Sequence, residues 1–206
     1  MKLYFSPGAC SLSPHIALRE AGIPFDLEQV DLRTKTTKSG EDYTQVNPKG
    51  YVPAFRLDNG DVLTEGAVLV QYLADQKPES KLAPANGTME RVRLQEWLHY
   101  IATEMHKGVS PLYNPKLEED ARNAVLDRLQ KRFDFLGEAV AKSKFLTGDT
   151  FTVADGYAYY TLRAWKKFSG ARYADSKPLR DYVARVEARP AVKAAVEAEG
   201  LPLIEA

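Results

Sequence analysis

The only cysteine of the chain, Cys10, is the side chain best suited to covalent chemistry. An apolar run over residues 3–5 predicts a strand that ends at Pro7 and Gly8, and a helical pattern begins at Ser11. The unpaired N–H groups and the positive dipole at the start of a helix stabilise an anion. We therefore expect the pKa of the Cys10 thiol to be lowered, which would make it a nucleophile. The alternative is a small buried side chain without chemistry.

The residues that follow Cys10 add further polar groups to the same junction. Ser11 could donate a hydrogen bond to a substrate sulfur, or it could only cap the helix. Ser13 gives the spacing C-x-x-S, and without a second cysteine any disulfide of Cys10 must form with an outside thiol. His15 is either a structural histidine or a modulator of the charge on Cys10. These residue types indicate thiol chemistry where the strand meets the helix.

Two short segments further along the chain could bind an extended peptide. If the Val52–Pro53 bond is cis, the backbone of Val52 faces outward beside Cys10 and pairs with the peptide as an added strand. A trans bond would leave an ordinary loop. Gly66 offers an N–H group to a carboxylate at a helix start, and Glu65 can accept a hydrogen bond from an ammonium group. Together they suit the α-amino-acid end of a γ-glutamyl group, unless they only begin a helix.

A polar stripe is predicted on the long helix that begins near residue 88. Glu96, His99, Thr103 and His106 are spaced three, four and three residues apart, so regular helical geometry places them on one face. This face either binds a ligand or is simply solvated. His106 is its best candidate for a proton-transferring role, and the spacing lacks the close-packed ligands of a metal site.

The elements that must position these residues fall into two parts. Up to residue 80 the pattern predicts the order of a thioredoxin-like α/β domain, with strands over 3–5, 25–30, 53–57 and 62–63 and helices over 11–21 and 65–75. A polar linker over 77–87 follows. Residues 88–206 predict an all-α helical bundle, with helices over 88–107, 118–142 and 152–168 and two short ones within 178–198. Thr152 and Asp155 predict a capping box at the third of these helices.

Composition narrows the class of protein. The 28 basic and 28 acidic residues balance, which is atypical of a nucleic-acid-binding protein. A hydrophobic content of 44% in 206 residues is enough for one large domain or two small ones. We expect neither a signal peptide nor a membrane-spanning segment, and a single cysteine forms no internal disulfide. These features predict a cytoplasmic protein.

Four motifs occur in order along both parts of the chain, namely S-P-G-A-C-S-L-S-P-H-I, N-P-K-G-x-V-P, L-T-E-G-x-x-x-x-Q-Y-L-A-D and F-T-V-A-D-x-Y. Together they resemble the beta class of bacterial glutathione S-transferases over essentially the whole length. The resemblance implies a thioredoxin-like glutathione-binding domain over 1–80 and a helical domain over 88–206 that contributes the electrophile pocket. It also implies glutathione as co-substrate, no metal, and a homodimer.

The resemblance further assigns the site residues. Cys10 matches the cysteine that contacts the glutathione sulfur or forms a mixed disulfide with it. With Ser11, proposed above from its position beside Cys10, and His106, it makes up the expected catalytic set. Pro53 matches the family's cis-proline and Val52 the residue that pairs with the cysteinyl backbone. The other implied glutathione contacts are Lys35, Glu65, Gly66, His99, Thr103, Glu104, Met105 and His106. Gly66 stands where many transferases have serine, and His99 stands where asparagine is common.

Two chemistries follow from this set of residues. One is conjugation of the glutathione thiol to small hydrophobic electrophiles, and the other is glutathione-dependent thiol–disulfide exchange through Cys10. The alternative from another class is a non-catalytic protein that carries ligands or acts in a stress response. The electrophile pocket is expected between the long helix and residues 109–113, where Tyr113 and Trp165 either line it or pack in the core.

Overall fold

The structure, a computed structural model, describes residues 1–205. Its sheet has five strands in the order β3-β2-β1-β4-β5, which are β1 (Lys2–Phe5), β2 (Asp26–Asp31), β3 (Thr36–Thr37), β4 (Ala54–Arg56) and β5 (Val62–Thr64). β1 pairs parallel to β2 and antiparallel to β4, with Leu3 opposite Leu27 on one side and Phe55 on the other. The hairpin of β4 and β5 is antiparallel, as the turn at residues 58–60 predicts.

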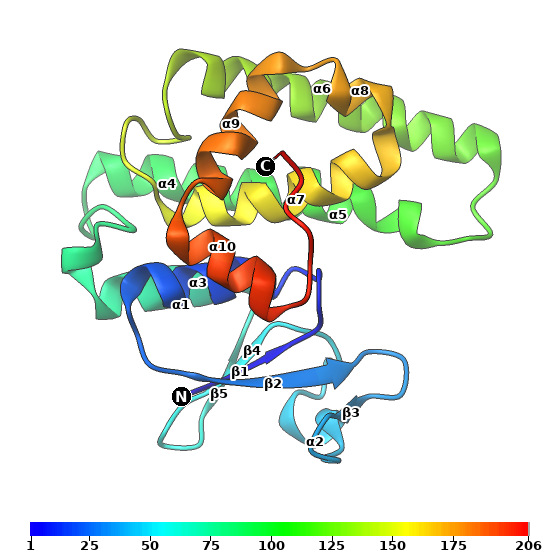
Figure 1. Ribbon diagram of the computed structural model, residues 1–206. Coiled ribbons are helices and arrows are strands. Elements are labelled where there is room, and N and C mark those ends of the chain that lie inside the picture. Colours follow the sequence, from blue (N-terminus) through cyan, green and yellow to red (C-terminus); the bar gives the residue numbers. More distant parts are fainter. Residues whose placement is uncertain (206) are drawn as a thin grey trace.

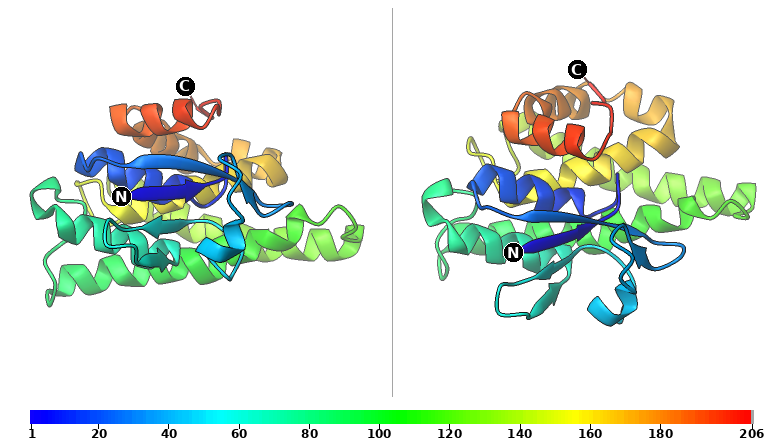
Figure 2. Two further views of the ribbon diagram at one scale, coloured as in Figure 1. Left: turned by 90° about the horizontal axis from the view of Figure 1, so that it is seen from below. Right: turned by 60° about the horizontal axis from the view of Figure 1, so that its bottom comes forward.

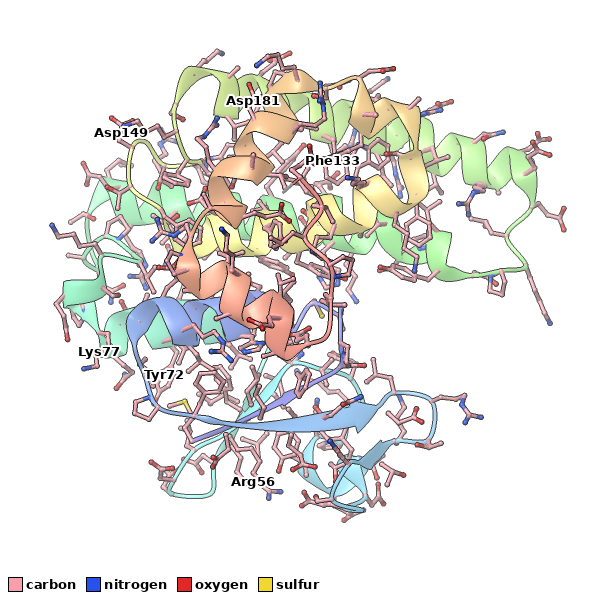
Figure 3. The ribbon with its side chains drawn as sticks, viewed as in Figure 1. Arg56, Tyr72, Lys77, Phe133, Asp149 and Asp181 are labelled. Carbon is pink, nitrogen blue, oxygen red and sulfur yellow. The ribbon has the colours of Figure 1, made fainter. Side chains whose placement is uncertain are left out.

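The central strand β1 is apolar because both faces of the sheet are covered. Leu3 and Phe5 belong to the main core under the helices, whereas Tyr4 belongs to a smaller cluster on the opposite face with Tyr43 and Val52. This alternation follows from the two-residue period of a strand. Arg56, labelled on the outer side of the sheet in Figure 3, pairs with Glu41 at 2.9 Å beside this smaller cluster, so the outer face is closed by polar groups.

The helices of the α/β part are α1 (Leu12–Ala21), α2 (Tyr43–Val46) and α3 (Gly66–Gln76), followed by the short 3₁₀ segment η1 (Pro78–Ser80). α1 ends at Gly22, whose φ of 63° lies in the left-handed region that glycine adopts readily. The predicted strands and the helices α1 and α3 are confirmed. The short elements β3 and α2 were not predicted, because two to four residues give no measurable hydrophobic period.

The helical part begins with a continuous run of α4 (Met89–Tyr100), the π-helical segment η2 (Ile101–His106), α5 (Lys107–Val109) and the 3₁₀ turn η3 (Ser110–Tyr113). It continues with α6 (Glu119–Lys142), α7 (Val153–Ser169), α8 (Ala171–Ala174), α9 (Lys177–Glu187) and α10 (Pro190–Ala198). The predicted long helices are confirmed, and α8 was missed. The Asp155 carboxylate accepts from the backbone N–H of Thr152 at 2.8 Å, as the predicted capping box requires.

The two parts share one apolar core. In Figure 1, α1 and α3 lie between the sheet and the long helices, and α1 packs against α7 and α10. Both views of Figure 2 show α10, near the end of the chain, alongside α1. Phe133 of α6, labelled within the helical part in Figure 3, stacks on Trp165 of α7 with ring centroids 4.6 Å apart.

This architecture confirms the predicted fold class, a thioredoxin-like α/β part followed by an all-α bundle. The domain limits 1–80 and 88–206 stay predictions, because the core is continuous across them. In the described part of the chain, none of the helices combines the length and the apolar character needed to cross a bilayer.

Candidate active site

A cavity of about 510 Å³ lies where the sheet meets the helical part. It brings together six of the predicted site residues, which are Cys10, Val52, Pro53, Glu65, Gly66 and His106. They come from the loop before α1, the loop before β4, the start of α3 and the end of η2. Residues more than 90 positions apart in the sequence therefore face one volume, whose size suits a small-molecule ligand.

Cys10 is half-buried in the wall of this cavity. Its Sγ donates to the carbonyl oxygen of Val52 at 3.3 Å. Burial raises the pKa of the Cys10 thiol to about 12, and this effect outweighs the backbone N–H groups of Cys10 and Ser11 and the charge of Lys107, which lower it. The predicted lowering of the Cys10 pKa is therefore wrong for the chain without ligand. The helix start does contribute in the expected direction, but desolvation of the thiolate is larger.

The catalytic role predicted for Ser11 is not supported by its position. The side chain is fully buried, and its Oγ accepts from the N–H of Ser6 at 3.2 Å and lies 3.3 Å from the Ser6 carbonyl oxygen. It makes no side-chain cap to α1. Ser11 therefore fixes the loop that carries Cys10 and does not face the cavity, so both predicted roles are corrected.

The Val52–Pro53 bond is cis, as the peptide-binding hypothesis requires. Both residues line the cavity next to Cys10, and the Val52 carbonyl is held by the Cys10 thiol. Nearby, the carbonyl of Tyr51 accepts from the Tyr43 hydroxyl at 3.0 Å and from the Asn47 amide at 2.7 Å. These contacts fix the segment that presents the backbone of Val52.

Glu65 and Gly66 lie on the far side of the cavity at the start of α3. The Glu65 carboxylate accepts from Lys49 Nζ at 2.6 Å, and this contact lowers the pKa of Glu65. Gly66 is the first residue of α3, so its N–H points out of the helix start. A Cβ added at Gly66 would meet only the Pro53 ring, at 3.9 Å, so the absence of a side chain here leaves open space.

Lys35 does not line the cavity. Its Nζ donates to the carbonyl oxygen of Gly50 at 2.7 Å, which holds the half-buried side chain against the loop before Tyr51. The backbone of Lys35 has φ of 59°, an uncommon conformation for a residue with a side chain. Its contact with a glycyl carboxylate remains a prediction.

The predicted polar face of the long helix holds for three of its four residues and is wrong for His106. His106 lines the cavity with Cys10, whereas His99, Thr103 and Glu96 line a different, exposed hollow with Phe135. The reason is η2, a π-helical segment whose wider turns change the angle between successive side chains. A prediction at a uniform 100° per residue cannot anticipate this change.

His106 itself is a neutral group. Its Nδ1 lies 2.8 Å from the Tyr157 hydroxyl, and its ring is edge-on to Tyr160 with centroids 5.0 Å apart. Burial, with a smaller effect of Lys107, lowers the pKa of His106 to about 4. At neutral pH the imidazole therefore carries no charge and is available as a hydrogen-bond partner.

Four other predicted glutathione contacts do not reach the cavity of their own chain. His99 and Thr103 are exposed, and the Thr103 hydroxyl donates to the His99 carbonyl oxygen at 3.0 Å. Glu104 is exposed and pairs with Arg132 of α6 at 3.0 Å. Met105 is fully buried in the core. None of the four lines the cavity of its own chain, so their contacts with glutathione stay predictions.

For His15 and Trp165, the alternative of a purely structural role is the one that the contacts support. His15 is fully buried, with Nδ1 2.9 Å from a Glu199 carboxylate oxygen and Nε2 accepting from Arg19 Nε at 2.9 Å. It lies among the aromatic rings of Phe5 and Phe25 and not in the cavity wall. Trp165 is fully buried against Phe133, so it packs the core.

Besides Tyr51, three tyrosines line the cavity, two of them unforeseen. Tyr157 and Tyr160 are three residues apart on α7, a spacing that places both on one face of the helix. This spacing in the sequence could have identified them as a shared wall of the cavity. Tyr113 of η3 also lines the cavity, which was one of the two alternatives expected for this residue, the other being packing in the core. Burial raises the pKa of all three phenols. They form an apolar wall with neutral polar tips opposite Cys10.

The charged groups of the cavity are few. Lys107 is exposed and lines it, and Glu65 is compensated by Lys49. Residues 1–205 contain no cluster of three or more histidine, cysteine, aspartate or glutamate side chains that could hold a metal ion. The arrangement can stabilise a bound sulfur by hydrogen bonds and positive charge, beside an extended peptide edge.

Comparison with known proteins agrees with this geometry. The family descriptions "Glutathione S-transferase, N-terminal domain" and "Glutathione S-transferase, C-terminal domain" match residues 8–76 and 103–199. The chain is 42% identical over 201 residues to glutathione S-transferase GstA of Escherichia coli O157:H7, covering 98% of this chain and 100% of that protein. It is 33% identical to glutathione S-transferase GST-4.5 of Xanthomonas campestris pv. campestris, covering 98% and 100%.

Solved structures give the same result. A ternary complex of BphK, a bacterial glutathione S-transferase, superposes with a TM-score of 0.94 at 50% identity, covering 98% of this chain and 100% of that one. A sphingomonad glutathione S-transferase complexed with glutathione superposes with a TM-score of 0.93 at 43% identity and the same coverage. The fold, the cavity and these similarities together show that the chain belongs to the glutathione S-transferase family.

Proposed function

We propose that the Cys10 cavity binds glutathione and that the protein conjugates its thiol to small hydrophobic electrophiles. One observation carries this proposal. Cys10, Val52 beside the cis bond and the helix start at Gly66 all line one cavity, which offers a separate partner to the thiol, the backbone and the carboxylate of a γ-glutamyl-cysteinyl peptide. The γ-glutamyl carboxylate would bind the Gly66 N–H, its ammonium group Glu65, and the cysteinyl backbone Val52.

In this arrangement Cys10 acts as a hydrogen-bond donor in conjugation. Its raised pKa keeps the thiol protonated at neutral pH, so it can donate to the glutathione thiolate. Without ligand, the thiol donates to the Val52 carbonyl oxygen at 3.3 Å. When glutathione binds, its cysteinyl N–H would donate to this oxygen instead and so release the Cys10 thiol to donate to the glutathione sulfur. Lys107 adds positive potential, and neutral His106 offers a further polar contact. The glutathione sulfur then attacks the electrophilic carbon.

Thiol–disulfide exchange is the second candidate function, favoured by the position of the single cysteine in the cavity wall. Cys10 would attack a bound disulfide, release one thiolate and form a mixed disulfide with glutathione, which a second glutathione then resolves. This route needs the Cys10 thiolate, which the ligand-free chain disfavours. The proton that Cys10 loses passes to the released glutathione thiolate, and the charge of Lys107 favours the Cys10 thiolate.

The deciding experiment is intact-protein mass spectrometry after incubation with oxidised glutathione, together with conjugation assays on the same samples. We expect Cys10→Ala to retain glutathione binding and part of the conjugation activity, and to lose any glutathione adduct and disulfide exchange. A retained adduct in Cys10→Ala would contradict the assignment of Cys10. Absence of glutathione affinity in the unaltered protein would favour the non-catalytic carrier instead.

We further propose membership of the beta class, on the four motifs around Cys10, Pro53, Gly66 and Asp155. A homodimer and a cytoplasmic location are proposed with it. The exposed hollow lined by Val92, Tyr100 and Phe135 supports the dimer, because apolar surface of this kind is typical of an interface. His99 and Thr103 line the same hollow, so this dimer would cover them. Size measurement by light scattering tests it.

A further inference from the structure

A second hollow of about 610 Å³ opens beside the Cys10 cavity. The two volumes share Ala9, Leu32, Tyr113 and Tyr160 in their walls. A molecule in the second hollow is therefore next to whatever occupies the first. This hollow is formed by the loop before α1, by α7 and by the segment after α10, so it combines the beginning and the end of the chain.

The walls of the second hollow are partly apolar. Leu32, Leu201 and Ile204 contribute aliphatic surface, and Tyr113 contributes a half-exposed ring that is edge-on to Phe168 with centroids 4.7 Å apart. Apolar walls with a few polar groups are the usual composition of a small-molecule site. The body of a ligand here would be aromatic or aliphatic.

The charged groups of this hollow all have one sign within the described chain. They are Arg163, Lys166 and Lys167, on consecutive turns of α7. Lys166 is neutralised, because its Nζ contacts the Ile204 carbonyl and lies 3.3 Å from the Glu205 carboxylate. Compensation of this kind is not found for the other two cations among residues 1–205.

Arg163 and Lys167 make only neutral contacts. Arg163 is half-buried and donates to the Tyr159 hydroxyl at 2.9 Å, with its guanidinium 5.5 Å from that ring. Lys167 Nζ lies 5.1 Å from the centre of the Tyr113 ring, and Tyr113 lines both hollows. Arg163 and Lys167 thus line the second hollow without a carboxylate partner among the described residues, and an anion bound in this hollow is attracted by both.

Glutathione does not account for these two cations. Neither Arg163 nor Lys167 lines the Cys10 cavity, and the tripeptide's carboxylates would lie toward Gly66 and Lys35 on the sheet side. The positive pair belongs to the helical side and faces the second hollow. It is therefore available to the other substrate.

We infer that the second substrate is an electrophile with an apolar body and a carboxylate, held in this hollow by Arg163 and Lys167. The inference rests on the proposed function, because it names the substrate class of the same site. An α,β-unsaturated ketone with an aryl carboxylate represents the class. Its carboxylate lies toward α7 and its unsaturated carbon toward the glutathione sulfur.

The reaction balances without an oxidant or reductant. The glutathione thiol loses its proton to solvent, and its sulfur forms a bond to the β-carbon of the unsaturated ketone. The π-electron pair of the carbon–carbon double bond moves toward the carbonyl as an enolate, whose α-carbon takes one proton from solvent. No leaving group departs, and the carboxylate is unchanged.

The test compares para-carboxybenzylideneacetone with its methyl ester, which has the same reacting carbon and no charge. Turnover is followed by loss of the enone absorbance at saturating glutathione, and each rate is divided by the uncatalysed rate with glutathione to remove the difference in reactivity. We expect the acid to be preferred in kcat/KM by about tenfold, mainly through KM, and the preference to shrink with added salt.

Matched variants identify the cations. Arg163→Met and Lys167→Met should each reduce the acid-to-ester preference, and the double variant should bring it close to one. Arg163→Lys should restore part of the preference. Lys193→Met, the same change at an exposed lysine of α10 outside both hollows, is the control and should leave the ratio unchanged.

The outcomes separate the two proposals. Equal turnover of acid and ester by the unaltered protein, or an unchanged ratio in the double variant, would overturn the assignment of the hollow and leave conjugation intact. Failure to conjugate either compound despite glutathione binding would overturn both. An equal fall of ester and acid turnover leaves the ratio unchanged and therefore also counts against the assignment.

Discussion

Two polar junctions near the start of α1 join the α/β part to the helical part, and they differ in how their groups are satisfied. At the first, the buried Glu199 carboxylate accepts from the N–H of Gly8 at 2.9 Å and from His15, whose other ring nitrogen accepts from Arg19. Because Arg19 Nε donates to Nε2, the neutral His15 ring must carry its proton on Nδ1. The second junction is the cavity around Cys10.

The first junction, at Glu199, is closed, because its polar groups are hydrogen-bonded within the protein. The second junction, the cavity at Cys10, is open, because it leaves polar groups available to a ligand. Gly66 presents an N–H out of a helix start, Lys107 is exposed, and His106 uses only one of its nitrogens in the contact with Tyr157. Buried polar groups that only hold a fold are normally fully paired. The difference shows that one junction maintains the position of the Cys10 loop and the other binds a ligand.

The largest expected effect comes from opening the closed junction. Glu199→Ala leaves the N–H of Gly8 and the Nδ1–H of His15 buried without an acceptor, so we expect the free energy of unfolding to fall by about 3 kcal/mol. The loss is measured by urea unfolding, as a lower midpoint at an unchanged dependence of the free energy of unfolding on urea concentration.

The matched control for this variant is Glu197→Ala, at an exposed glutamate two residues earlier. We expect it to change stability by no more than about 0.5 kcal/mol. Similar losses in the two variants would show that the Glu199 contacts do not hold the junction.

The second effect concerns the reactivity of the open junction. Because burial raises the pKa of Cys10 to about 12, the thiolate is scarce at pH 8. Alkylation of Cys10 by iodoacetamide should be slower than that of a free cysteine by at least about a hundredfold, and its rate should still rise with pH above 9. Mass spectrometry of timed samples measures it, and rapid alkylation at pH 7 would refute the raised pKa.

The third effect is a pH dependence of stability at the cavity. His106 binds a proton in the unfolded chain near pH 6.5, but in the folded chain only near pH 4. As the pH falls from 7.5 to 5, the unfolded state gains a proton that the folded state lacks, so stability is lost by about 2 kcal/mol. We expect His106→Asn to lack this contribution.

The contribution of His106 is the difference between the urea midpoints of His106→Asn and the unaltered protein at several pH values. Other titrating groups are the same in both proteins and cancel in this difference. Parallel pH profiles of His106→Asn and the unaltered protein would contradict the lowered pKa of His106.

The smallest effect would be a gain at the open junction. Gly66→Ser places a hydroxyl beside the proposed γ-glutamyl carboxylate, and a Cβ there meets only Pro53, at 3.9 Å. We expect glutathione to bind about fivefold more tightly, which corresponds to about 1 kcal/mol. Calorimetric titration measures the change. Gly66→Ala is the control, and an equal gain with alanine would show that the hydroxyl makes no contact.

Local sequence signals predicted the part of the site that depends on single segments. Cys10 at a strand–helix junction and the helix start at Gly66 are each encoded within a few residues, whereas the cis bond before Pro53 was implied by the family resemblance. The order of strands and helices followed from hydrophobic period, since that period is set by the geometry of each element.

The remaining features depend on contacts between distant residues. Ser11 is directed inward by Ser6, and His106 by Tyr157, which is 51 positions away in the sequence. The raised pKa of Cys10 results from burial by both parts of the chain, which a helix dipole argument omits. The placement of His106 on the face of Glu96 and His99 failed because the prediction assumed a regular helix through η2.

The contact between Gly8 and Glu199 has a consequence for how the protein is made. The two residues are 191 positions apart, so the loop before Cys10 lacks this acceptor until the ribosome has added almost every residue. The strands and α1 can associate earlier, because N-terminal segments generally fold first during synthesis. We expect chains stalled before Glu199 to have a more easily alkylated Cys10 than completed chains, a difference that thiol labelling of arrested ribosomes would detect. The thiol would thus become protected only after synthesis has passed Glu199.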